Sequence, residues 1–229
     1  ASLDAYDAVV FNNTNNEIFL PENFSQLTAA EQEPLAATDA RLKQNLVEFL
    51  EGGRGLAVIH AGVASFREWP EFGKIMGARF DNHPWNAGST ITIKVDDPVH
   101  PLTQAFAGSP HLEVSDEIYQ LTGDYSRDLV RVLVSVDMER TALTPAQREA
   151  IHRTDSDFPL SFVKSCGRGR VFYGALGHQH EIFWNRVILQ HYLDGIQFAL
   201  GDLEADTTPS NAVGPAGSSR AEEQRGGER

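Results

Sequence analysis

The stretch that decides the fold is GGRGLAVIHAG at residues 52–62, where the apolar run GLAVI lies between glycines and a histidine. Such a run predicts a strand that is buried on both faces. A similar run, YDAVVF at residues 6–11, precedes it. Between the two runs we expect a helix capped by Thr38 and Asp39, because apolar residues recur there at helical spacing, at Leu42, Leu46, Val47, Phe49 and Leu50. Strand, helix and strand in this order predict the right-handed crossover of a parallel sheet.

Further strands and a closing helix follow along the chain. TITIKV at residues 90–95 alternates as a half-buried strand does, and residues 129–136 are rich in β-branched side chains. Residues 158–164 and 170–175 flank a glycine-containing turn, which predicts a hairpin. Residues 182–200 repeat apolar side chains at helical spacing and stop at a glycine. We therefore expect an α/β fold with helices packed on a mostly parallel sheet.

Length, charge and cysteine content exclude several classes of protein. The 229 residues suit one α/β domain, and the net charge of -13 disfavours contact with nucleic acid or a membrane surface. No run approaches the roughly 18 apolar residues that span a bilayer. The single Cys166 excludes an internal disulfide and a multi-cysteine metal site. This cysteine content is compatible with a protein of the cytoplasm or of the periplasm.

The last 26 residues differ in composition from the rest. Residues 204–229 contain no Leu, Ile, Phe, Trp or Tyr amid Pro, Gly, Ser, Thr and charged residues. Such a segment buries too little apolar surface to offset its ordering entropy. We predict a folded domain over residues 1–203 and a disordered tail over residues 204–229.

Two histidines follow predicted strands at the place where ligands bind in open parallel sheets. His60 comes directly after GLAVI, and His178 follows the strand that ends near Ala175. We predict catalytic roles for His60, His178 and the adjacent carboxylates Asp116 and Glu117. Imidazoles with carboxylates bind divalent cations such as zinc, and they also transfer protons near neutral pH. The sequence does not separate these two roles, and the metal-ligand candidates are His60, His83 and His178.

Several aromatic residues and histidines near these motifs are candidates for substrate binding, namely Trp69, His83, Tyr119, His180 and Trp184. Each has a structural alternative. His83 precedes a proline and suits a turn, Asp116 can cap or pair locally, and tryptophans more often belong to the core. Cys166 lies in a predicted turn without a neighbouring base, so we interpret it as a passive thiol.

The order of these motifs resembles the ThuA-like (trehalose utilisation) family. The resemblance covers about Leu3 to Leu203, and the segments that carry it are GGRGLAVIHAG, WPEFGKIMGARFDNHP, DDPVHPLTQAF, SDEIYQL, DFPLSFVKSCGRGRVFYGALGHQHEIFW and HYLDGIQFALGDL. It implies a flavodoxin-like three-layer sandwich of the class I glutamine amidotransferase type. It also implies a bacterial role in the catabolism of disaccharides or their 3-keto derivatives.

The chain departs from the family pattern in two places. An N-terminal strand-helix unit that family members usually carry is expected to be missing, and residues 137–157 form an excursion with a short helix at TPAQREAIHR. Where the amidotransferases carry their nucleophilic cysteine, this chain has His60. We therefore expect acid/base or metal-assisted chemistry on a glycoside or 3-keto-glycoside. The alternatives are a non-catalytic carbohydrate-binding or assembly module and an amidase-like hydrolase, and the expected partners are a small carbohydrate, a second copy of the chain or an oxidoreductase.

Overall fold

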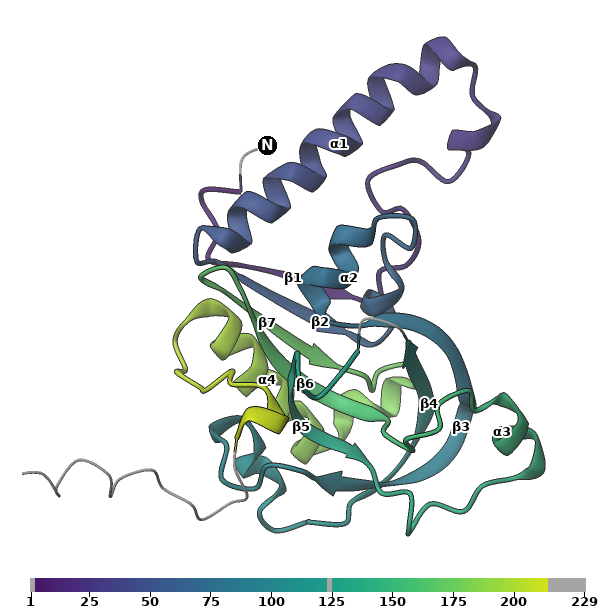
Figure 1. The fold of residues 1–229 in the computed structure, drawn as a ribbon, viewed down its shortest axis with the longest axis vertical. Coiled ribbons are helices and arrows are strands. Elements are labelled where there is room, and N and C mark those ends of the chain that lie inside the picture. Colours follow the sequence, from purple (N-terminus) through teal and green to yellow (C-terminus); the bar gives the residue numbers. More distant parts are fainter. Residues whose placement is uncertain (1–2, 123–124, 214–229) are drawn as a thin grey trace, which may run out of the picture.

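The computed structural model describes residues 3–122 and 125–213 of the chain. Within these residues seven strands form one sheet in the order β1-β2-β7-β6-β5-β3-β4 (Figure 1). The strands are β1 Ala8–Asn12, β2 Gly55–Ile59, β3 Arg79–Val95, β4 Glu113–Thr122, β5 Arg131–Val136, β6 Pro159–Cys166 and β7 Gly169–Gly174. The α-helices are α1 Ala29–Glu51, α2 Pro70–Met76, α3 Pro145–Ala150 and α4 Arg186–Leu200.

The parallel pairing predicted for the first two strands, with a helix between them, is confirmed. β1 pairs parallel with β2, and α1 connects them. β2 also pairs parallel with β7, with Ile59 opposite Gly174. Three neighbouring strands therefore end at the same edge of the sheet, and the segments that follow β2 and β7 start side by side. This edge holds the candidate site.

The prediction of a mostly parallel sheet is wrong, and the flavodoxin-like three-layer arrangement is not confirmed. β7 with β6, β6 with β5, β5 with β3 and β3 with β4 all pair antiparallel. The β6–β7 hairpin was expected, and its turn contains Gly167 at φ 57, a left-handed conformation that favours glycine. Parallel pairing needs a crossover connection of a dozen or more residues, so a short turn of this kind reverses the strand direction. The crossover pattern of the first 60 residues does not extend to the later strands.

β3 is a 17-residue strand that bends sharply, and Figure 1 shows it curving around one side of the molecule. Its first part pairs with β4 through three register shifts between Phe80 and Ser89, and its last three residues pair with β5. Bulges of this kind bend a strand and increase its twist. The bend brings β4 to the edge where β2 and β7 end, although β4 lies at the far end of the strand order.

The two longest helices start and end at recognisable caps. α1 begins after Thr28, whose capping box with Glu31 closes the first turn, so the predicted start at Thr38 is wrong. The Thr38 hydroxyl instead donates to the carbonyl of Pro34 inside the helix. α4 begins after Asn185, which accepts two backbone N–H bonds, and the predicted start at residue 182 is early because a short 3-10 helix precedes it. No described helix is long and apolar enough to cross a membrane.

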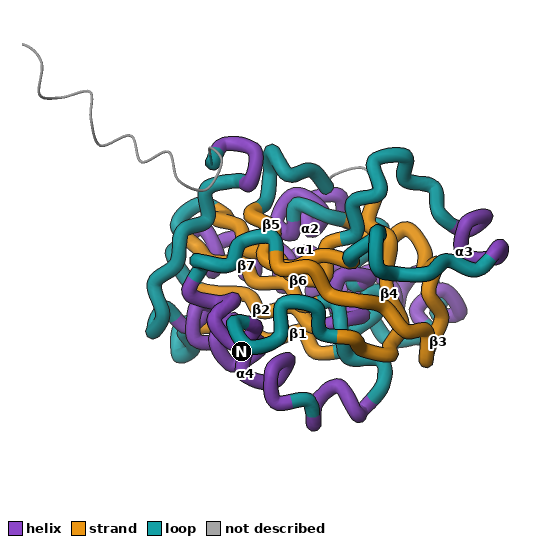
Figure 2. The backbone as a smooth tube through the Cα atoms, turned by 90° about the horizontal axis from the view of Figure 1, so that it is seen from below, coloured by secondary structure: helices purple, strands orange, loops and turns teal. Residues whose placement is uncertain are grey.

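The strands run through the middle of the molecule, and α4 packs against β2 and β7 (Figure 2). The central strands bury Phe162, Phe172 and Tyr173 completely. At Gly174 a Cβ atom would lie 2.4 Å from the Tyr192 ring of α4, so only glycine allows this approach. The Tyr192 hydroxyl donates to the carbonyl of Leu176 at 2.6 Å. α4 thereby supports the segment that follows β7.

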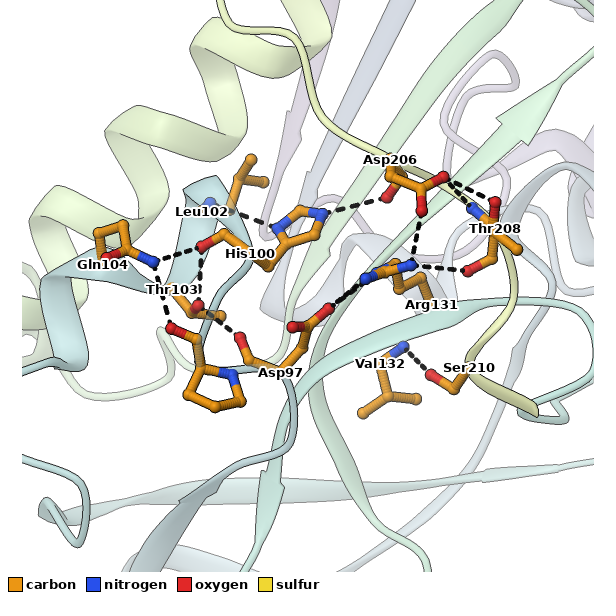
Figure 3. A network of polar contacts seen from close by, with 11 residues as sticks. Asp97, His100, Leu102, Thr103, Gln104, Arg131, Val132, Asp206, Thr208 and Ser210 are labelled. Atoms are coloured by element: carbon orange, nitrogen blue, oxygen red, sulfur yellow. Dashed lines mark hydrogen bonds and ion pairs between the residues drawn. The ribbon is translucent and has the colours of Figure 1, made fainter. Parts of the chain in front are cut away.

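Residues 204–213 lie against the domain through polar contacts (Figure 3). The Asp206 carboxylate pairs with Arg131 at 2.8 Å, and the Asp206 carbonyl accepts a hydrogen bond from His100 Nε2 at 3.0 Å. The remainder of the predicted tail, residues 214–229, lies outside the described residues.

Candidate functional site

His60 directly follows β2, as the first residue of the short 3-10 helix His60–Ala64. Its backbone has φ 48, a conformation that is uncommon outside glycine and often found at functional positions. The side chain is only 2% exposed, and Nδ1 lies 2.7 Å from the carbonyl oxygen of Ala175. Because a carbonyl only accepts, Nδ1 carries the proton in this bond. The free lone pair of the neutral ring is therefore on Nε2.

The Nε2 atom of His60 faces two side chains of β4. The hydroxyl of Tyr119 lies 3.2 Å away and donates to Nε2, and Glu117 Oε2 lies 3.4 Å away. Burial lowers the pKa of His60, and burial together with the neighbouring Glu117 raises the pKa of Tyr119. His60 is therefore a neutral imidazole near pH 7, and Tyr119 keeps its proton as a hydrogen-bond donor.

Glu117 is the centre of the cluster. Its Oε2 atom lies 3.4 Å from His60 Nε2 and 3.3 Å from His178 Nδ1, and its Oε1 atom lies 3.6 Å from His83 Nδ1. The Glu117 side chain is 12% exposed, whereas those of His83 and His178 are 46% and 45% exposed. The carboxylate thus lies between one buried imidazole and two that reach solvent, an arrangement that suits proton transfer between the interior and the surface.

Asp116 holds the backbone of the loop that carries His178. It is fully buried, and its two carboxylate oxygens accept three backbone N–H bonds, from Gly177 at 2.6 Å, Gln179 at 2.8 Å and His178 at 3.3 Å. The Gly177 carbonyl accepts a further bond from the Asn13 side chain at 3.1 Å. These contacts make Asp116 a positioning residue, while the neighbouring Glu117 contacts the imidazoles.

The structure brings together His60, His83, Glu117, Tyr119 and His178 from the predicted set. Other predicted residues have different described contacts. The ring of Trp69 packs against Phe66 and Phe72, and His180 is an exposed residue near Glu181. Trp184 is 79% exposed. Substrate contacts by Trp69, His180 and Trp184 stay predictions.

Cys166 is remote from this cluster. It ends β6 opposite Gly169, the first residue of β7, and so lies at the edge of the sheet opposite to His178. Burial raises the pKa of its thiol, which disfavours the nucleophilic thiolate. The geometry agrees with the interpretation of Cys166 as a passive residue.

Sequence reasoning missed three contributors to the site. The carbonyl of Ala175 sets the tautomer of His60, and a backbone atom leaves no signal in a sequence. Asn13 holds the loop after β7, and its place just after the first strand was the only available signal. The Arg67 guanidinium lies 4.7 Å from the centre of the Phe80 ring, which itself contacts Tyr119, so a positive charge lies near the cluster.

Three of these side chains also lie close enough together to hold a metal ion. The ligand atoms of His60, Glu117 and His178 lie within 4.8 Å of one another. His83, which was also predicted as a ligand, is not among the three side chains that lie this close together in the described part of the chain. Its Nδ1 instead lies 3.0 Å from Asn86 Oδ1.

Comparisons with known proteins agree with the resemblance in the sequence. A family model described as ThuA, trehalose utilisation, matches residues 1–199. A ThuA-like protein from Parabacteroides merdae is 18% identical with a TM-score of 0.58, over 88% of this chain and 73% of that chain. A ThuA-like protein from Bacteroides uniformis is 20% identical with a TM-score of 0.56, over 85% of this chain and 70% of that chain.

A third structure, from Salmonella typhimurium and described as a cytoplasmic protein, is 14% identical with a TM-score of 0.57, over 89% of this chain and 74% of that chain. No curated protein matches the chain. At these identities the structural likeness concerns the fold alone.

Proposed function

The chain belongs to the ThuA trehalose-utilisation family, and on this premise we propose that it is an enzyme of carbohydrate catabolism that acts on a glycoside or 3-keto-glycoside. The observation that carries the proposal is the position of Glu117 Oε2 between His60 Nε2 at 3.4 Å and His178 Nδ1 at 3.3 Å. Three titratable side chains from separate elements thus converge at the edge of a sheet, which is a frequent place for active sites.

The arrangement suits chemistry at a C–H bond next to a carbonyl group. A keto group at C3 acidifies the proton at C2, and a base that removes this proton leaves an enolate whose oxygen needs a donor or a cation. The enolate then re-forms the carbonyl at C3 and forms a double bond between C1 and C2 as the bond from C1 to the glycosidic oxygen breaks. The departing oxygen takes a proton from an acid. Glu117 with His178 would accept the C2 proton and return one to the leaving oxygen, while the Tyr119 hydroxyl or the Arg67 charge would stabilise the enolate oxygen.

The hydrolase alternative has less support because the cluster holds no thiol. Cys166, the sole cysteine, lies at the opposite edge of the sheet. By the resemblance to the glutamine amidotransferases, His60 stands at the position of their nucleophile, and its Nε2 accepts a hydrogen bond from Tyr119. The binding-module alternative shares the same cluster and differs only in turnover.

The proposal is tested by incubating the protein with matched pairs of native and 3-oxidised glycosides, trehalose included, and following products by NMR and mass spectrometry. We expect turnover of at least one compound and its loss in Glu117→Gln, with the fold retained. His152→Ala is the control, because His152 is an exposed histidine whose described partner is Asp81 at 2.9 Å. Binding of a sugar with no change in its structure would identify a binding module instead. Full activity in Glu117→Gln would place the chemistry elsewhere.

A further inference from the structure

The donor atoms at the centre of the cluster come from three separate parts of the fold. His60 follows β2, Glu117 lies in β4, and His178 lies in the loop after β7. Their ligand atoms lie within 4.8 Å of one another. Two imidazole nitrogens and one carboxylate oxygen are a donor set that zinc and similar divalent ions prefer. The convergence therefore has the chemistry of a metal site as well as that of a proton relay.

Two of the three separations between ligand atoms fit a single ion. A four-coordinate ion with bonds of about 2.0–2.1 Å holds neighbouring ligand atoms about 3.3 Å apart. Glu117 Oε2 lies 3.4 Å from His60 Nε2 and 3.3 Å from His178 Nδ1. The third separation, between the two imidazole nitrogens, is at most 4.8 Å, and the His178 side chain is 45% exposed. The two shorter separations already match the required geometry.

Neighbouring groups orient two of the three ligands. The hydrogen bond from His60 Nδ1 to the Ala175 carbonyl leaves Nε2 free to bind an ion. Asp116 accepts the backbone N–H groups of Gly177, His178 and Gln179 and so holds the His178 backbone. Partners that fix the tautomer and direction of a ligand are typical of protein metal sites.

We infer that His60, Glu117 and His178 bind one divalent transition-metal ion of the zinc class and leave its fourth position open. Three protein ligands with one open position are typical of catalytic rather than structural zinc sites. The nitrogen donors favour such ions over Mg²⁺ and Ca²⁺, which prefer oxygen. An ion on His60 Nε2 would replace the hydrogen bond from the Tyr119 hydroxyl. The role of the ion, polarising the keto oxygen of a substrate, rests on the proposed function, whereas its binding does not.

Metal binding is tested on the full chain after treatment with a chelator. Zn²⁺ alone is titrated by calorimetry, and Co²⁺ alone is followed by the visible absorption of the four-coordinate ion. We expect one ion per chain, and an affinity at least about 100-fold lower in Glu117→Gln and in His178→Ala. The control His152→Ala, which removes an exposed histidine close to a carboxylate, keeps the affinity of the unaltered chain.

Two results would overturn the inference. The first is no binding up to about 1 mM Zn²⁺, a concentration that would detect even a very weak site. The second is binding that neither Glu117→Gln nor His178→Ala weakens. Activity is read separately. If the chain binds zinc but turns over no glycoside, the metal site is supported and the proposed function is wrong. If the metal-free chain shows full turnover, the proposed function is supported and the ion has no role in it.

Discussion

Replacing Asp116 by asparagine tests whether one buried carboxylate holds the loop after β7. The two oxygens of Asp116 accept the N–H groups of Gly177, His178 and Gln179 at 2.6, 3.3 and 2.8 Å. An asparagine side chain has one oxygen and one NH₂ group. Whichever way the amide is turned, at least one backbone N–H faces another donor.

The cost follows from the bonds that are lost. Losing one hydrogen bond to a charged acceptor costs about 1.5–3 kcal/mol, and a buried N–H without an acceptor adds to this. We expect the free energy of unfolding to fall by about 3 kcal/mol, which lowers the Tm of a domain of this size by about 6–12 °C. Because His178 is carried by this loop, Zn²⁺ affinity should fall about 10- to 100-fold, as it does when orienting partners are removed.

Urea unfolding measures the first effect and calorimetric titration with Zn²⁺ the second. Asp202→Asn is the matched control, because Asp202 is exposed and the change removes the same charge. If only the loss of a negative charge mattered, the stability and the zinc affinity would change equally in both variants. If Asp116→Asn unfolds at the urea concentration of the unaltered chain and binds zinc equally well, the carboxylate does not position the loop and the argument fails.

Three further predictions concern the core and the cluster. Burial lowers the pKa of His191 to about 4, so the unfolded chain takes up the proton first as the pH falls through about 6.5, and stability decreases toward pH 4. Between pH 7 and pH 4.5 the free energy of unfolding, measured with urea, should fall by roughly 2–3 kcal/mol more in the unaltered chain than in His191→Gln. In Gly195→Ala the new Cβ would lie 2.4 Å from the Phe172 ring, so the free energy of unfolding should fall by about 1–3 kcal/mol. Gly108→Ala is the control, because a Cβ at Gly108 would meet open space and should leave the stability unchanged. Equal stabilities of the two variants would contradict this packing. Tyr119→Phe removes a hydroxyl proposed to stabilise the enolate oxygen. The turnover of a keto-glycoside should fall about 100-fold or more, the usual cost of losing one donor to a developing oxyanion. Unchanged kinetics would remove Tyr119 from the mechanism.

Local patterns in the sequence predicted the elements that short-range physics determines. The apolar runs at β1 and β2, the helix between them and the glycine turn before β7 each carry their own signal. They were enough to place His60 and His178 after strands, and the pairing of β2 with β7 came from the structure. The start of α1 was missed because the capping box at Thr28 and Glu31 lies before the apolar face begins.

The rest depends on contacts that a local pattern does not contain. The alternation at residues 90–95 predicts a strand, but nothing in it shows that β3 starts at Arg79 and changes partner from β4 to β5. The composition of residues 204–213 shows little apolar burial, whereas the segment makes polar contacts that include those of Asp206 with Arg131 and His100. An argument from composition counts only the apolar surface that a segment can bury and leaves out its polar contacts.

The same departure from a parallel sheet also makes the site. In a wholly parallel sheet, functional side chains come from segments that follow neighbouring strands, as His60 and His178 do here. Glu117 instead lies within β4, an antiparallel strand at the other end of the strand order. It reaches both imidazoles because the register shifts of β3 fold the sheet back on itself. A change that straightens β3, far from the imidazoles in sequence, should therefore separate the carboxylate from them while β2 and β7 stay paired.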